Sequence, residues 1–81
     1  MTNLIAKKPS GENSVYKAED RAEAEKLINT IISQIRAVIN PELLTITRKE
    51  DDVIIKWDGK EITTLLIRED DEIDLSLTNE Q

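Results

Sequence analysis

The chain has 81 residues, no cysteine, no histidine and a formal net charge of −6. Without cysteine it has neither disulfides nor thiolate metal sites, and without histidine it lacks the usual general base and the commonest metal ligand. Proteins that bind nucleic acids or anionic membranes carry clustered lysine and arginine, which this sequence lacks. No apolar run is long enough to span a membrane. We therefore expect one cytoplasmic, non-enzymatic domain without cofactor or metal.

Residues 1–17 are rich in loop-forming residues, and Pro9, Ser10 and Gly11 predict a turn or a flexible joint. Two short apolar islands, at residues 4–6 and 15–16, interrupt this segment. They leave two alternatives, an arm that becomes ordered only on a partner or an extra edge strand docked on the domain. We assign residues 1–17 to an N-terminal arm and residues 18–81 to a single domain.

A helix is predicted over about residues 19–39, because apolar residues recur there at steps of three and four. Asp20 and Glu23 have the spacing of a capping box at its start. Asn40 and Pro41 end it, since proline cannot continue the hydrogen-bond ladder. The apolar stripe is broad, so we expect it to contact more than one neighbouring element; it comprises Ala24, Leu27, Ile28, Ile31, Ile35 and Val38.

Alternating apolar residues predict four strands after the helix, over about residues 43–49, 53–57, 61–68 and 72–78. Asp58 and Gly59 suit a two-residue type I′ turn, which fixes the register of the second and third strands. The cross-strand pairs that follow are Trp57 with Lys60, Lys56 with Glu61, and Ile55 with Ile62. Because every connection is short, we predict an α+β fold, with one helix packed on a four-stranded antiparallel meander.

In such a meander two acidic turns emerge at the same end of the sheet. We call this group the acidic pole, and it consists of Glu50, Asp51, Asp52, Glu69, Asp70, Asp71 and Glu72. Repulsion among these carboxylates costs stability that a purely structural turn could avoid, so it favours a functional role. Three such roles are docking of a basic protein surface, imitation of a nucleic-acid backbone, and binding of a divalent cation. The alternative is that acidic turns only keep a small sheet soluble. Calcium fits least, because neither turn has the spacing of a calcium-binding loop.

The predicted face away from the helix carries a second candidate surface, the outer patch, formed by Ile54, Leu65 and Ile67. The outer patch has three possible interpretations. It is covered by a lid made of residues 4–5 or 15–16, it is a self-complementary dimer face, or it is simply exposed. Trp57, the only tryptophan, is expected either to plug the end of the core or to anchor a partner.

No phosphate-binding loop or nucleophile motif is present, and the carboxylates fall on solvated turns where nothing would set one pKa apart from another. We therefore expect a non-enzymatic protein-binding module, such as an adaptor, an inhibitor or an assembly subunit, that docks a basic partner through the acidic pole. A phage-type nucleic-acid mimic and a purely structural subunit are the alternatives. The sequence leaves open whether the protein is a monomer or a homodimer.

Overall fold

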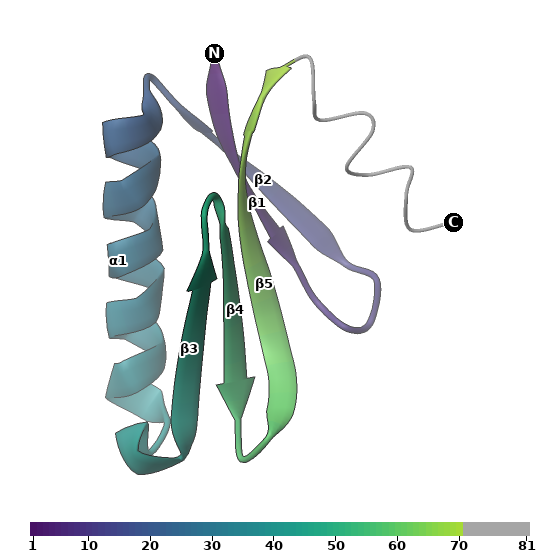
Figure 1. The fold of residues 1–81 in the computed structure, drawn as a ribbon, viewed down its shortest axis with the longest axis vertical. Coiled ribbons are helices and arrows are strands. Elements are labelled where there is room, and N and C mark those ends of the chain that lie inside the picture. Colours follow the sequence, from purple (N-terminus) through teal and green to yellow (C-terminus); the bar gives the residue numbers. More distant parts are fainter. Residues whose placement is uncertain (71–81) are drawn as a thin grey trace.

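The computed structural model describes residues 1–70, which form an α+β fold with one helix and a five-stranded antiparallel sheet (Figure 1). The α+β class and the antiparallel sheet were both predicted and are confirmed. The strand order is β2-β1-β5-β4-β3. The elements are β1 (Thr2–Lys7), β2 (Asn13–Ala18), α1 (Arg21–Val38), the 3-10 helix η1 (Pro41–Leu43), β3 (Leu44–Lys49), β4 (Asp52–Trp57) and β5 (Lys60–Glu69).

The N-terminal segment forms the hairpin of β1 and β2, so the docked-strand alternative is the one observed. Gly11 adopts a φ of +95° in the connecting turn, where its N–H donates to the Lys8 carbonyl at 2.9 Å. In contrast to the predicted edge position, β1 lies inside the sheet, between β2 and β5. Leu4 and Ile5 point to opposite faces and are both fully buried, as expected of a central strand.

β3, β4 and β5 are consecutive neighbours, as the meander predicted. The prediction of a simple four-stranded meander is nevertheless wrong, because β1 occupies the position beside β5 that was assigned to residues 72–78. Those residues lie outside the described part of the chain. Hydrophobic alternation predicts that a segment is a strand, but it does not say which distant strand will pair with it.

Helix α1 begins where the capping signal predicted. The Asp20 side chain accepts a hydrogen bond from the Glu23 N–H at 2.9 Å, and the last helical residue, Val38, comes shortly before Pro41. Within residues 1–70, no helix has the length and the apolar character that crossing a bilayer requires.

The β4–β5 hairpin turns at Asp58 and Gly59, which have φ values of +51° and +80°, as the predicted turn requires. The pairs of Trp57 with Lys60 and Lys56 with Glu61 are also confirmed. Further along, Ile55 pairs with Thr63 and not with Ile62, because a β-bulge adds Ile62 to β5. Every later residue of β5 therefore points to the face opposite the predicted one.

The bulge places Leu65 and Ile67 under α1, where they are 0% and 2% exposed. The predicted outer patch is therefore wrong, because two of its three members belong to the core and only Ile54 keeps its expected face. Leu66 takes the opposite face, away from α1. The core cluster consists of Leu4, Ala18, Ala24, Ile28, Val53, Ile55, Leu65 and Ile67.

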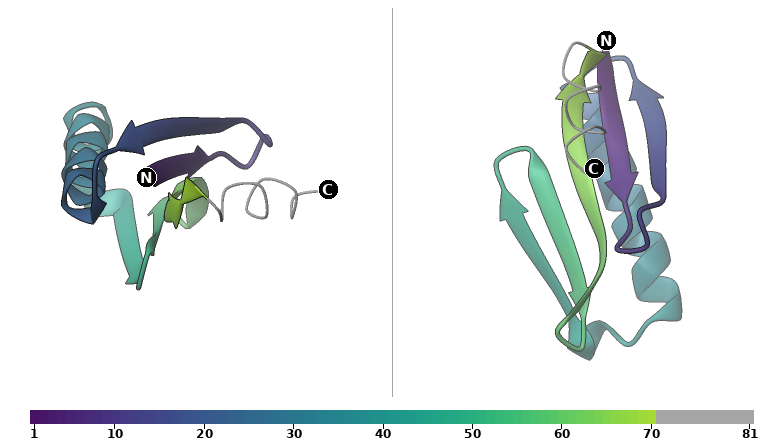
Figure 2. Two further views of the ribbon diagram at one scale, coloured as in Figure 1. Left: turned by 90° about the horizontal axis from the view of Figure 1, so that it is seen from above. Right: turned by 90° about the vertical axis from the view of Figure 1, so that its right-hand side faces the viewer.

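Helix α1 packs mainly over β1, β2 and β5, and Figure 2 shows that it covers a single side of the sheet. Its fully buried residues, Ala24 and Ile28, lie in its first half. Ile31, Ile32 and Ile35 in the later part are only partly buried. The C-terminal half of α1 and the nearby β3 therefore leave apolar surface incompletely covered.

Candidate protein-binding surface

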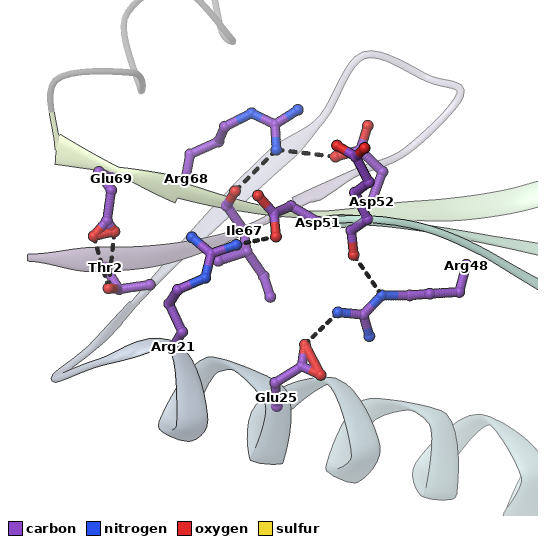
Figure 3. Close-up of polar contacts among 10 residues, drawn as sticks. Thr2, Arg21, Glu25, Arg48, Asp51, Asp52, Ile67, Arg68 and Glu69 are labelled. Atoms are coloured by element: carbon purple, nitrogen blue, oxygen red, sulfur yellow. Dashed lines mark hydrogen bonds and ion pairs between the residues drawn. The ribbon is translucent and has the colours of Figure 1, made fainter.

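The β3–β4 turn and the end of β5 lie together at one end of the sheet (Figure 3). Glu50 and Asp51 form the β3–β4 turn, with Glu50 at a φ of +49°. The Asp51 carbonyl accepts a hydrogen bond from the Ile67 N–H at 3.0 Å, which joins this turn to the end of β5. Glu69 and Asp70 follow at that end of β5, while Asp71 and Glu72 lie outside the described residues.

Most described members of the acidic pole have a partner within the protein. Asp51 forms an ion pair with Arg21, the first residue of α1. Asp52 pairs with Arg68 of β5, with an N–O distance of 2.9 Å. The Glu69 carboxylate lies 2.9 Å from the Thr2 hydroxyl, which donates to it.

Asp70 is held against the start of β1. The Asn3 Nδ2 donates to Asp70 Oδ1 at 2.7 Å, and the N-terminal ammonium group of Met1 lies 3.5 Å from Oδ2. The Asn3 hydrogen bond is the main cause that lowers the pKa of the Asp70 carboxyl, and the N-terminal charge acts in the same direction. Asp70 is thus charged and has internal partners.

Arg48 connects the β3–β4 turn to the helix. Its Nε donates to the Glu50 carbonyl at 2.8 Å, and its Nη2 lies 2.5 Å from Glu25 Oε1 on α1. Together with the Arg21 to Asp51 pair, this contact ties α1 to the turn. These arginines were not predicted to take part, although the position of Arg48 two residues before Glu50 is a signal in the sequence.

Glu50 differs from its neighbours, because its exposed side chain has no ion pair among residues 1–70 and only its backbone carbonyl is used. Even after internal pairing, acidic groups outnumber cationic ones at this end. The acidic groups are Glu19, Asp20, Glu23, Glu25, Glu50, Asp51, Asp52, Glu69 and Asp70, and the cationic groups are the N-terminus, Lys17, Arg21, Arg48, Lys49 and Arg68. This end of the molecule therefore keeps a net negative charge, and we call it the acidic end.

The opposite end of the molecule exposes large apolar side chains. Val38, Leu43 and Trp57 are 83%, 41% and 38% exposed, and we call them the apolar end. They belong to three elements at this end of the molecule: α1 ends at Val38, and the Leu43 carbonyl accepts a hydrogen bond from the Asp58 N–H at 2.9 Å, which joins η1 to the β4–β5 turn (Figure 1). Trp57 is thus only partly packed, and part of its ring is available to a partner.

The edge strand β3 runs between these two ends. It begins at Leu44, which pairs with Trp57, and it ends at Lys49, directly before Glu50. On its other side no strand of the described chain pairs with it. Such an edge presents backbone N–H and C=O groups that can accept another strand.

No group of three or more potential metal-ligating side chains is found in residues 1–70, and these residues enclose no pocket. Comparison with models of protein families, with curated proteins and with solved structures gave no match.

Proposed function

We propose that this protein is a small non-enzymatic protein-binding module, and that an extended segment of a basic partner adds to the free edge of β3. The observation that carries the proposal is the unpaired side of β3 among the described strands, between the acidic end and the apolar end. In strand addition, main-chain hydrogen bonds supply affinity and alternate side chains supply specificity.

The apolar end supplies contact area for one part of the partner segment. Val38, Leu43 and Trp57 offer apolar surface next to the start of β3, and an exposed tryptophan is a frequent source of binding energy. The acidic end supplies long-range attraction for a basic partner, which speeds encounter and weakens as salt rises. Lys49 opposes this attraction, whereas Arg48 is already engaged by Glu25 and Glu50.

Imitation of a nucleic acid is less well supported. A mimic needs carboxylates that are free and spaced along a surface in the way phosphates are. Here Asp51, Asp52 and Asp70 are bound by Arg21, Arg68 and the N-terminus, respectively. These ion pairs favour a role of the acidic turns in holding the fold, with only the remaining net charge acting on a partner.

The proposal is tested by affinity capture from the native host with the full chain and matched variants. Val38→Ser removes apolar surface from a side chain that is 83% exposed, and Glu50→Gln removes a charge without breaking an ion pair among the described residues. Val15→Ser and Glu61→Gln are the controls, because they make the same changes at exposed residues of β2 and β5, away from the edge of β3. We expect several-fold weaker capture with Val38→Ser and a smaller salt dependence with Glu50→Gln.

Hydrogen exchange on the captured complex tests the binding mode. Strand addition would protect those amides of β3 that face away from β4, at alternate residues, and would leave the other edge strand, β2, unchanged. Equal capture by all variants together with unprotected β3 amides would contradict the proposal and would favour a purely structural subunit.

A further inference from the structure

The edge strand β3 has two chemically different faces. Ile46 pairs with Ile55, which belongs to the core cluster, and directly opposed residues of neighbouring strands share a face. The α1 side of β3 therefore carries Leu44, Ile46 and Arg48, and the other side carries Thr45, Thr47 and Lys49. A segment added at this edge meets apolar side chains on one face and hydroxyl groups on the other.

The apolar face of β3 borders the later half of α1. The residues that pack against the core cluster here and stay only partly buried are Leu44, Ile46, Ile31, Ile32 and Ile35. The fully buried residues of α1 lie in its first half, and η1 joins the end of α1 to the start of β3 (Figure 1). A sixth strand beside β3 would place its own α1-side residues on this apolar surface and would extend the sheet layer under the helix.

Residues 44–47 lack the features that usually protect an edge strand from further pairing. They include no charged residue and no proline, and no bulge interrupts their pairing with β4. Arg48, the first charged residue on the α1 side, is engaged by Glu25 and by the Glu50 carbonyl. The first part of β3 therefore suits a strand with the same alternation of apolar and uncharged polar residues.

Charge and strand pairing together favour one direction for the added segment. Every strand pair of the described sheet is antiparallel, and antiparallel pairing is the more stable per residue. An antiparallel segment begins beside Lys49 and ends beside Leu44. A basic residue placed just before the paired positions therefore lies next to Glu50, which is exposed and has no ion pair among residues 1–70, and avoids the place opposite Lys49.

We propose that the partner segment is an amphipathic strand that runs antiparallel to β3, with lysine or arginine at its N-terminal end and apolar residues at alternate positions facing α1. The polar residues between them face Thr45 and Thr47. This assignment rests on the proposed function and narrows it to one pattern and one direction of the partner chain.

Synthetic peptides with blocked ends test the pattern and the direction. The first peptide is Lys-Thr-Val-Thr-Val-Thr-Val; its controls have the same composition, one with the order reversed and one with the valines brought together as Lys-Thr-Thr-Val-Val-Thr-Val. Binding to the full chain is followed by amide chemical shifts. We expect shifts in β3 and the later half of α1, none in β2, and several-fold tighter binding of the first peptide. Equal affinity for the three peptides, or unshifted β3 amides, would overturn the proposal.

The charge contact is tested with Glu50→Gln and a peptide that begins with glutamine. At low salt the unmodified protein should bind the lysine peptide several-fold more tightly than the glutamine peptide, and Glu50→Gln should remove this preference. Glu61→Gln is the matched control and should keep it. A preference that survives Glu50→Gln would contradict the proposed direction.

These outcomes separate this assignment from the proposed function. If the native partner protects the β3 amides while the three peptides bind equally, only the assignment of the segment falls; if neither partner nor peptide affects β3, both fall. Shifts of β3 amides that grow with protein concentration in the absence of peptide would place a second copy at the edge and would also overturn the assignment.

Discussion

Ile62 is the residue that sets the composition of the core in β5. As the extra residue of the bulge, it shifts the alternation so that Leu65 and Ile67 face α1. The turn residues Asp58 and Gly59 predict the first pairs of the hairpin correctly, because those pairs depend only on local backbone geometry. The bulge escaped prediction because it results from packing against the whole sheet, and the sequence from Glu61 to Thr63 has no glycine to mark it.

Substitution of Leu65 distinguishes the observed register from the predicted one. Because Leu65 is 0% exposed, Leu65→Ala should lower the free energy of unfolding by about 2–5 kcal/mol in urea denaturation. Val38→Ala, at a site that is 83% exposed, should cost less than about 0.5 kcal/mol. Similar small losses in both variants would contradict the burial of Leu65.

Asp70 makes folding stability depend on pH in the acid range. Its folded-state pKa is lowered, so its contribution to stability is fully present above its ordinary value of about 3.9 and is lost as the pH falls through the lowered value. In Asn3→Ala, removal of the main cause should raise the Asp70 pKa towards its ordinary value. Carboxyl chemical shifts measured during an acid titration would follow this change, and an unchanged Asp70 titration would rule out the role of Asn3.

At the level of elements, α1, β3, β4 and β5 lie within a few residues of their predicted bounds, because their signals are local; the predicted strand at residues 72–78 lies outside the described part of the chain. The helix has a cap at Asp20 and a stop at Pro41, and β3, β4 and β5 have alternating apolar residues and short turns. The N-terminal hairpin was harder to recognise. Pro9, Ser10 and Gly11 predicted a turn or a flexible joint, and the turn is observed, but the two apolar islands did not specify a partner strand.

The β4–β5 turn depends on backbone conformation more than on contacts. Gly59 has a φ of +80°, and a Cβ built there would meet no atom within 4 Å. Gly59→Ala should therefore destabilise the fold through backbone strain, by about 1–2 kcal/mol. Asp58→Asn is the control, because asparagine also tolerates positive φ and should leave the urea midpoint nearly unchanged. Equal stability of Gly59→Ala and the wild type would exclude this turn geometry.

Over the whole molecule, ion pairs join the helix to the sheet. The Arg21 to Asp51 pair is partly solvent-exposed, with side chains 52% and 43% accessible. A double-mutant cycle with Arg21→Ala and Asp51→Ala should therefore give a coupling of only about 0.2–1 kcal/mol, decreasing with added salt. A coupling of zero at low salt would mean that this pair contributes nothing to holding α1 on the β3–β4 turn.

The candidate surface was predicted in part at this scale. Asp71 and Glu72 lie outside the described residues. The carboxylates at the start of β4 and at the end of β5 come together because these strands form a hairpin, and this could be argued from the sequence. Their pairing with Arg21, Arg48 and Arg68 could not, because it depends on where α1 crosses the sheet. The edge position of β3 was already implied by the predicted meander, in which residues 43–49 form the first strand, but the docking of β1 beside β5 was not.

The central place of β1 also has a consequence for the order of folding. β1 can pair with β5 only after β5 has been synthesised. Until then Leu4 and Ile5 lack the contacts that β5 provides in the folded sheet. Closing such a distant pairing is entropically costly and slows folding relative to a helical chain of similar size. The nascent N-terminal hairpin is therefore the segment most in need of protection from aggregation before the sheet closes.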